Sequence, residues 1–458
     1  MRLRILTYIS VVGIILCSCA NTQKIMQNEK NKLPDKLFRE EGMRYADSTN
    51  NLGLTDWREL FTDTSLARLI DTALIRNSDL RIAQLRVREV QQSLKVSRLA
   101  YIPSFGIAPN GAVSSFDNGK PTWVYSAPVT ASWQLELFGG KTSAKRGAKA
   151  SYEASVAAAQ GVRANIIATT ANMYYTLLML DEQLDIATET EKSWAKNVET
   201  LKIMKEAGMS NEAAVSQMEA NYYAICTTVN DLKKEILLVE NSLSAILYKE
   251  PGRIERGRLA EQRIPQKLYV GLPVEILSNR PDVIAAERSL LQALYYTRET
   301  RAALYPGITL SGSGGWTNNV GSLIVNPGKL LFSAAASLFQ PILQGGQLRA
   351  SHKIAKYRFE EMALDFGQTL LNAGNEVNKA LADCQTSRDN RQQLEKQVAS
   401  LGKAVESTKL LMQYGSTTYL DVLVAEQALL AAKMSLASNR FDEIEGIVNL
   451  YIALGGGK

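Results

Sequence analysis

Apolar and polar side chains alternate along residues 123–137. The odd positions of this segment carry Trp123, Tyr125, Ala127, Val129, Ala131, Trp133, Leu135 and Leu137. The even positions are mostly polar. A period of two over this length, with aromatic residues toward both ends, predicts a membrane β-barrel strand with an apolar side to lipid and a polar side to the lumen. We expect four strands, at about 104–116, 122–138, 307–317 and 330–343; the last alternates too weakly to assign its lipid-facing side.

Most of the remaining chain has a helical pattern. Residues 141–206 contain no proline and are rich in Ala, Glu, Lys and Leu. This composition predicts a helix of about 100 Å, with coiled-coil-like packing. Residues 347–413 repeat the pattern. The other predicted helices cover residues of about 66–100, 212–248, 281–304 and 419–454.

The two halves of the chain repeat one plan. In helices, the matched pairs include Asp79 with Asp282, Arg98 with Arg301, Gly208 with Gly415, Val215 with Val422 and Glu219 with Glu426. The offset between partners is nearly constant, which predicts the same elements in the same order. Each half reads as helix, two strands, long helix, turn and helix. The predicted fold class is therefore mainly α with a membrane β-barrel, with two structural repeats, four strands and long helices per protomer.

Four strands in one chain are too few for a closed barrel, because small barrels need about eight. Open strand edges cannot face lipid, since their backbone groups would stay unpaired there. Several copies of the chain must therefore contribute strands to one barrel. Twelve strands from three copies or sixteen from four would both serve.

The N-terminus predicts export and lipidation. Two arginines precede an apolar run at 5–16, and small residues follow, as in a signal peptide. A Leu-Cys-Ser motif before Cys19 resembles a bacterial lipobox, which makes 1–18 a lipoprotein signal peptide and Cys19 the lipidated residue. Cys17 fits this pattern less well, and an ordinary signal peptide is the alternative. Ala20, in place of Asp, favours export to the outer membrane.

Composition excludes several function classes. A net charge of +6 over 458 residues, without a dense basic patch, does not suggest a partner nucleic acid. One histidine and four cysteines form no catalytic or metal-binding constellation, so we predict no enzyme, no metal site and no cofactor beyond the lipid. Cys226 and Cys384 would lie at different heights along their helices, too far apart for a disulfide. We expect both to be free and buried.

Four motifs carry a family resemblance. They are GLPVEILSNRPDVIAAERSLLQA (271–293), DWRELF (56–61), QPILQGG (340–346) and LELFGGK (135–141). In combination they resemble the lipoprotein branch of the TolC-type outer-membrane efflux channels. The resemblance covers nearly the whole mature chain.

The resemblance implies a homotrimer with a 12-stranded barrel in the outer membrane and a 12-helix periplasmic tube. Its partners would be a periplasmic adaptor and an inner-membrane pump, usually of the RND type. The channel would passively export small toxic molecules or metal ions. Its segments would be a lipidated N-terminal and equatorial part (19–60), a first repeat (61–248), an equatorial linker (249–280) and a second repeat (281–458).

The turns after the two long helices are candidate functional sites. Gly208 and Gly415 are expected to end these helices in the left-handed conformation. Candidate N-caps of the following helices are Ser210 or Asn211, and Thr417 or Thr418. The resemblance implies that these turns close the channel and contact the adaptor through Gly208, Ser210, Gly415 and Thr417.

Asp421 is the candidate gate residue. Its repeat partner is Ala214, so the helix itself does not require a carboxylate. One interpretation is a solvated aspartate that supports the helix N-terminus. The other, from the resemblance, is a ring of three carboxylates on the trimer axis, where repulsion would raise their pKa. Family members often have a second acid three residues on, but here it is Val424, so the gate would be formed by Asp421, Leu420 and Val424.

Two other functions remain open. A conduit for type I protein secretion would share the barrel and tube. A periplasmic coiled-coil scaffold would lack the barrel. The lipobox and the Arg-Pro-Asp motif favour efflux, and the duplicated strand pairs disfavour the scaffold.

Overall fold

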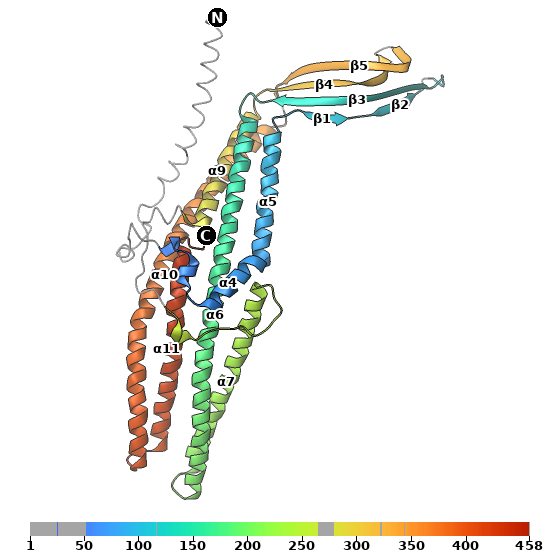
Figure 1. The fold of residues 1–458 in the computed structure, drawn as a ribbon. Coiled ribbons are helices and arrows are strands. Elements are labelled where there is room, and N and C mark those ends of the chain that lie inside the picture. Colours follow the sequence, from blue (N-terminus) through green and yellow to red (C-terminus); the bar gives the residue numbers. More distant parts are fainter. Residues whose placement is uncertain are drawn as a thin grey trace. The chain divides into compact units, whose positions relative to one another are not determined.

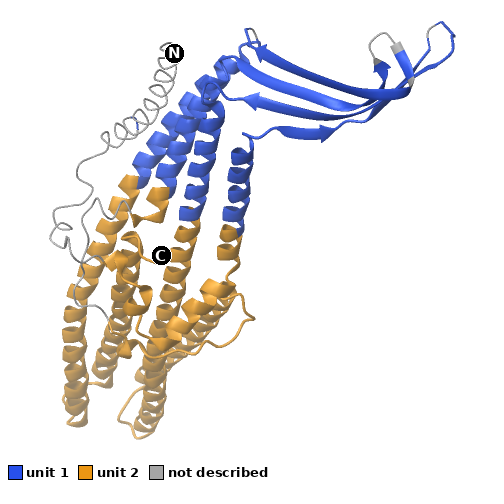
Figure 2. Cartoon of the chain, turned by 45° about the horizontal axis from the view of Figure 1, so that its top comes forward, with its two compact units in different colours: residues 1–33, 85–157, 285–369 blue, residues 34–84, 158–284, 370–458 orange. Residues whose placement is uncertain are grey.

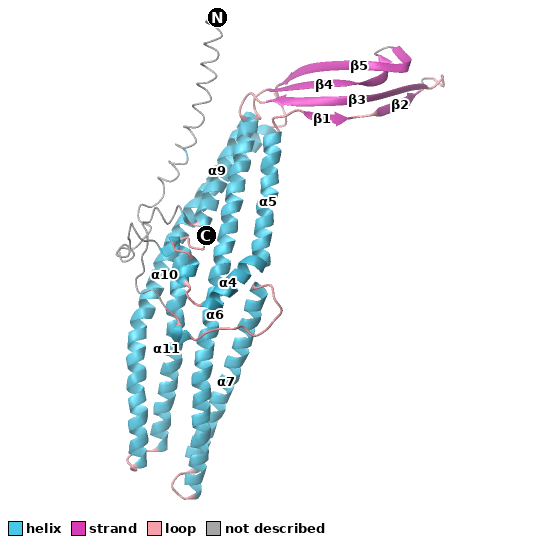
Figure 3. Cartoon of the chain, viewed as in Figure 1, coloured by secondary structure: helices cyan, strands magenta, loops and turns pink. Residues whose placement is uncertain are grey.

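The computed structural model describes residue 25 and residues 52–115, 117–263, 279–320, 323–342 and 344–457. Its elements are drawn in Figure 1, and Figure 3 separates helices from strands. The helices are η1 (Leu52–Leu54), α3 (Trp57–Leu60), α4 (Thr64–Arg76), α5 (Ser78–Leu99), α6 (Gly140–Glu206), α7 (Glu212–Ile246), η2 (Leu259–Glu261), α9 (Pro281–Ala302), α10 (Gln347–Gln413) and α11 (Tyr419–Ala453). The strands are β1 (Ser104–Ile107), β2 (Asn110–Ser114), β3 (Thr122–Leu135), β4 (Gly307–Val320) and β5 (Leu323–Phe339). The predicted signal peptide and Cys19 lie outside the described residues.

The helix lengths support the predicted duplication. The helices α5, α6 and α7 have 22, 67 and 35 residues. Their counterparts α9, α10 and α11 also have 22, 67 and 35 residues. Among these described helices, none is long and apolar enough to cross a membrane.

The chain divides into two compact units, coloured separately in Figure 2. We call the first the sheet unit; it holds residues 85–157 and the described part of 285–369. We call the second the turn unit; it holds the described parts of 52–84, 158–284 and 370–457.

The sheet unit contains one antiparallel sheet in the order β1-β3-β4-β5, with β2 also paired to β3. β3 and β4 pair from Ser126 with Thr317 to Leu135 with Ile308, which joins the strands of the two repeats. Most of the apolar positions of β3 are exposed in the single chain; Trp123, for example, is 68% exposed. Within the described residues, the sheet ends at two unpaired edges, β1 with β2 on one side and β5 on the other.

The strand limits differ from those predicted. The segment expected as one strand at 104–116 is interrupted between β1 and β2, although the register with β3 is the same on both sides. Pro109 lies in this gap and Pro128 in the facing part of β3, and proline has no backbone N–H to donate to the sheet. β3 ends at Leu135 and not at 138, because the next residue, Glu136, turns toward α6 and accepts a hydrogen bond from the Thr142 N–H at 2.7 Å.

The second strand pair is longer at its turn end than predicted. β4 continues to Val320 and β5 begins at Leu323, not at 330, and it ends at Phe339, not at 343. The pairing passes a register shift between Thr317 and Asn319. The Asn318 side chain compensates for this shift: its amide donates to the Trp123 carbonyl and accepts from the Tyr125 N–H, both at 2.8 Å. The strand bounds predicted from the sequence left residues 318–329 outside both strands.

One of the predicted helices is divided into two helices in the structure. The helix expected at about 66–100 breaks into α4 and α5 at Asn77. The Asn77 backbone N–H ends α4 by donating to the Ala73 carbonyl at 2.8 Å. Its side-chain oxygen accepts from the Asp79 N–H at 2.9 Å and thereby starts α5. A single asparagine that caps both helices explains the break.

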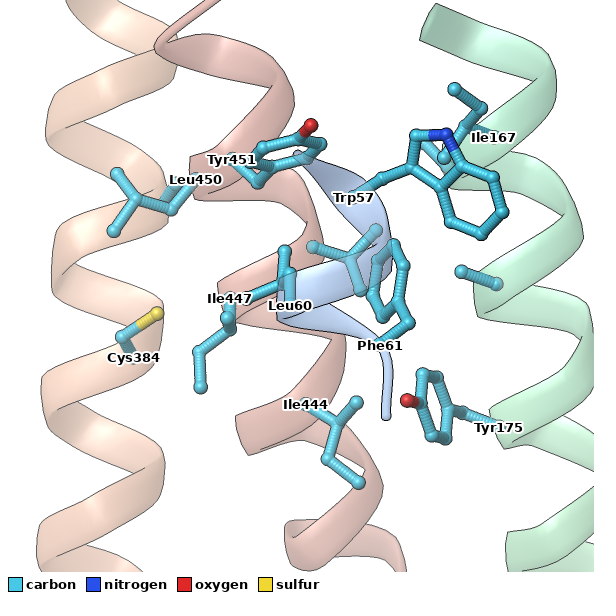
Figure 4. Packing of buried hydrophobic residues seen from close by; sticks show 14 of the residues in the cluster. Trp57, Leu60, Phe61, Ile167, Tyr175, Cys384, Ile444, Ile447, Leu450 and Tyr451 are labelled. Carbon is cyan, nitrogen blue, oxygen red and sulfur yellow. The ribbon is translucent and has the colours of Figure 1, made fainter. Parts of the chain in front are cut away.

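The largest core of the turn unit forms around α3 (Figure 4). Trp57 and Phe61 are 1% and 4% exposed and lie between α6, with Tyr175, and α11, with Ile444 and Tyr451. The Asp56 side chain accepts from the Arg58 N–H at 2.8 Å and caps this short helix. The DWRELF motif therefore has a structural role, because its apolar side chains pack between α6 and α11.

Two arginines, the buried Arg280 and the largely buried Arg256, anchor the connecting segments of the turn unit. Arg256 forms a bidentate ion pair with Asp181 of α6 and also pairs with Glu240 of α7. Arg280, in the Arg-Pro-Asp motif, donates to Glu376 of α10 at 2.6 Å and to the carbonyl of Ala453, the last residue of α11, at 2.9 Å. These fork-shaped guanidinium contacts fix the chain before α9 and after α7.

Cys226 and Cys384 are free, as predicted. Cys384 is buried, and Cys226 is only half-buried, so the prediction of burial is wrong for Cys226. The Cys226 sulfur lies 3.5 Å from the carboxylate of Glu191 on α6, so it borders a polar side chain.

Candidate functional site

The two turns between the long and shorter helices end α6 and α10 in the same way. Gly208 and Gly415 have φ angles of +74° and +72°, as predicted for left-handed caps. The residue after each glycine donates its N–H back into the helix: Met209 to the Met204 carbonyl at 2.8 Å, and Ser416 to the Leu411 carbonyl at 2.9 Å. This is a Schellman arrangement, and it reverses the chain within a few residues.

The helices that follow begin differently. In the first turn the N-cap is Asn211, whose side-chain oxygen accepts from the Ala214 N–H at 2.8 Å. In the second turn the N-cap is Thr418, and the Asp421 carboxylate reaches back to accept from the Thr418 N–H at 2.9 Å. The two predicted alternatives at each cap are thus settled as Asn211 and Thr418.

Asp421 is held by donors of its own turn. The same carboxylate oxygen also accepts from the hydroxyls of Thr417 at 2.6 Å and Thr418 at 2.7 Å. Hydrogen bonds to the charged form stabilise it, so the hydroxyls of Thr417 and then Thr418 lower the pKa of Asp421 to about 2. In the chain taken alone, this is opposite to the raised pKa that we predicted. Thr417, a predicted adaptor contact, is engaged with Asp421.

The predicted gate residues share one exposed face at the start of α11. Leu420 and Val424 are 55% and 57% exposed. On the opposite face, Val422 and Leu423 are buried. Two exposed aliphatic side chains beside one carboxylate form a patch that a second chain could cover.

A buried glutamate lies on the inner face, one turn beyond the gate residues. Glu426 is 9% exposed. Its carboxylate accepts from the Trp194 indole N–H at 2.9 Å and from the Asn197 amide at 3.3 Å, both on α6. Its other oxygen pairs with Lys409 of α10 at 2.6 Å. Glu426 therefore binds α11 to both long helices.

The repeat partner of this glutamate has fewer contacts. Glu219 on α7 pairs with Lys202 of α6 at 2.7 Å, which repeats the pair of Glu426 with Lys409. Glu219 is 32% exposed. At the positions equivalent to Trp194 and Asn197, the second repeat has Leu401 and Ala404, which carry no donor.

Comparison with known proteins identifies the family. A family model described as "Outer membrane efflux protein" matches residues 69–247 and 272–456, which is more than half of the chain. The chain belongs to the outer membrane efflux protein family. The mainly helical fold class predicted from the sequence, with its TolC-type resemblance, is confirmed.

Three relatives illustrate the range of this efflux protein family. The chain is 28% identical over 419 residues to the cation efflux system protein CusC of Escherichia coli O6:H1, covering 90% of each chain. It is 28% identical to the probable outer membrane lipoprotein SilC of Salmonella typhimurium, covering 97% and 96%. It is also 28% identical to the toluene efflux pump outer membrane protein TtgC of Pseudomonas putida, covering 88% and 85%. A crystal structure of CusC matches with a TM-score of 0.81 and 26% identity, over 93% of this chain and 99% of that one.

The structure brings together some of the predicted site residues of this efflux protein. Asp421, Leu420 and Val424 are neighbours on one face, and Asp421 contacts Thr417. Gly208 and Ser210 belong to the other turn. The gate and adaptor roles of these residues stay predictions.

Sequence reasoning missed Glu426, which it used only as a marker of the repeat. The signal was present: Val422, Leu423 and Glu426 share one helix face, so a carboxylate sits on an otherwise apolar stripe. A tryptophan in the facing helix also needs an acceptor for its N–H when it is buried.

Proposed function

We propose that this protein is the outer-membrane channel of a tripartite efflux system, in which it acts as a homotrimer. It passively conducts small toxic compounds or metal ions from a periplasmic adaptor and an inner-membrane RND-type pump to the exterior. The observation that carries this proposal is the family match across both repeats. Efflux channels of this family are not enzymes and need no cofactor.

The sheet supports a trimeric barrel. Each chain offers four strand positions, since β1 and β2 follow one line along β3. Among the described residues of one chain, both edges of this sheet are unpaired, and an open edge in lipid leaves backbone groups without partners. Pairing β5 of one copy with β1 and β2 of the next removes all edges. Three copies give the expected 12 strands, and their helices give the 12-helix tube.

The two turns are proposed as the periplasmic end of the channel. Leu420, Asp421 and Val424 of three copies would form the constriction, with one ring of carboxylates and a larger apolar surface. The adaptor would contact the exposed backbone around Gly208, Ser210, Gly415 and Thr417. This assignment rests on the family resemblance and on the position of these residues, which are exposed except for the half-buried Ser210 and Thr417.

Cys19 is the proposed lipid attachment site. The lipobox before it supports this role, and so does SilC, whose name describes it as a lipoprotein. Mass spectrometry of the mature N-terminus of the wild type should find Cys19 as the first residue, with covalently attached lipid. A Cys19→Ser variant should lose this mass, and an unmodified Cys19 in the wild type would refute the assignment.

The channel itself is tested with full-length protein in outer-membrane fractions and planar bilayers. We expect a species that migrates as a trimer unless heated, and that conducts ions in bilayers. Export by the full system should depend on co-expressed adaptor and pump. A soluble, elongated monomer without conductance would refute the proposed function.

A further inference from the structure

A large cavity lies within the sheet unit, between segments of α5, α6, α9 and α10. Its volume is about 840 Å³, which is within the range of about 300–1,000 Å³ for sites that hold drug-sized ligands. Small side chains such as Ser97, Ala144 and Ser151 line it on α5 and α6. Because these side chains are short, the larger ones on the facing helices have free space in front of them.

The facing helices supply the charges of this cavity. Glu299 on α9 and Glu361 on α10 contribute carboxylates, and Arg358 on α10 contributes a guanidinium. Tyr296 precedes Glu299 by three residues, so both lie on the same helix face. Two acids against one base favour a positively charged occupant.

Glu299 also lines a second cavity of about 460 Å³, next to the start of β4. The other charged residues of this cavity, Lys141 and Glu136, already form hydrogen bonds. Lys141 donates to the Ala100 carbonyl at 2.8 Å, and Glu136 accepts from the Thr142 N–H. Glu299 is thus the acid shared by both cavities.

Glu299 lacks a partner of its own. It is half-buried, and within the described residues its carboxylate has no hydrogen bond or ion pair. Burial raises its pKa, which shows that the surroundings penalise the charge. Burying an uncompensated charge costs free energy, and a cation placed beside it offsets that cost. The Tyr296 ring, 39% exposed, offers a surface for stacking or a cation–π contact.

We propose that Glu299 and Tyr296 form a binding site for aromatic organic cations on their way through the channel. The site lies where the helical cavity meets the cavity beside β4, so that Glu299 serves both. This inference rests on the proposed channel function and names one class of substrate for it.

The test uses two ions of matched shape and opposite charge, tetraphenylphosphonium and tetraphenylborate. Equilibrium dialysis against purified full-length trimer in detergent measures saturable binding of each ion. We expect the wild type to bind the cation and not the anion. Glu299→Gln keeps the shape and removes the charge, so cation affinity should fall by about tenfold or more. Tyr296→Leu should weaken it severalfold.

Glu360→Gln is the matched control. Glu360 is exposed on α10, next to Glu361, and lines neither cavity. This variant should bind the cation as the wild type does. Equal loss in both variants would show diffuse attraction and overturn the site. Absence of saturable binding to the wild-type trimer would also overturn it.

Bilayer conductance distinguishes a failure of this inference from a failure of the proposed function. If the wild type forms bilayer channels but Glu299→Gln binds the cation unchanged, only the inference fails. If the wild type forms no channels, the proposed function fails first. Glu299→Gln itself should retain trimer formation, because the substitution removes a charge that has no partner.

Discussion

The two inter-helix turns share a backbone but differ in their polar contacts. Both end a 67-residue helix with a left-handed glycine and begin a 35-residue helix. In the first turn, the side chain of the N-cap residue Asn211 accepts a hydrogen bond from the Ala214 N–H, three residues further on. In the second turn the roles are reversed: the Asp421 side chain accepts from the N–H of the N-cap residue Thr418, three residues earlier. The two repeats share the backbone fold of the turn, but different residues accept the hydrogen bonds of its backbone N–H groups.

The difference extends to the glutamates one turn further along. Glu426 ties α11 to α6 and α10, whereas Glu219 ties α7 to α6 by one partly exposed ion pair. In one chain, the second turn is therefore the more firmly held of the two. If three chains close at these turns, the α11 side supplies both the gate residues and the anchor behind them.

The largest expected effect comes from Glu426→Ala compared with Glu219→Ala. Removing Glu426 leaves the buried Trp194 N–H without an acceptor and breaks the link to Lys409, which should cost about 2–4 kcal/mol. Removing Glu219 breaks one exposed pair and should cost about 1 kcal/mol or less. Urea unfolding of the purified protein, followed by circular dichroism, measures both. Equal losses would contradict the asymmetry.

The turn glycines should show no such asymmetry. An alanine Cβ would meet nothing within 4 Å at Gly208 or Gly415, so the cost is that of the left-handed backbone alone. Gly208→Ala and Gly415→Ala should each lose about 1–2 kcal/mol. The same urea titration applies. A clear difference between them would show that one turn has contacts which the described chain lacks.

The N-cap of α7 can be replaced with the residues that cap α11. Asn211→Ala removes the acceptor for the Ala214 N–H and should cost about 1 kcal/mol. The double variant Asn211→Thr with Ala214→Asp copies the second turn and should regain most of that loss. Hydrogen exchange of the first turn of α7 reports the effect locally. Failure of the double variant to recover protection would mean that the two turns differ in more than their caps.

Much of this arrangement could be predicted from the sequence, because it depends on local patterns. The absence of proline and the composition set the bounds of α6 and α10 within a residue, and the glycines marked the turns. The breaks at Asn77 and Pro109 were missed for a physical reason. Asn77 fits a helix by periodicity and interrupts it only through its own side-chain contacts. Pro109 matters because it lies opposite Ala127, next to Pro128, across the sheet, and a single strand does not reveal its partner.

The candidate site, too, could be predicted from the sequence only in part. Helix periodicity placed Leu420, Asp421 and Val424 together, but it did not reveal the donors around Asp421. Those donors come from two neighbouring threonines whose rotamers depend on the turn. Glu426 was missed because its acceptor role depends on Trp194, which lies more than two hundred residues earlier in the chain.

The smallest effect concerns the pH dependence of Asp421. Its pKa in the folded chain is about 2, below the ordinary value of 3.8, because the threonine donors favour the charged form. A lowered pKa contributes stability that is fully present above pH 3.8 and is lost as pH falls toward 2. We expect hydrogen exchange in the first turn of α11 to speed up in this window for the wild type. Asp421→Asn should exchange fast throughout.

The same residue distinguishes capping from the carboxylate ring in the assembled channel. Repulsion among three carboxylates would shift their titration upward, while the threonine donors shift it downward. Three donors on one oxygen are direct contacts, so we expect bilayer conductance of the wild type to titrate only below about pH 4. Asp421→Asn should remove that titration and change conductance equally at pH 5 and pH 7. A wild-type titration above pH 4 would show that the ring outweighs the cap, and that the gate depends on charge more than its apolar neighbours suggest.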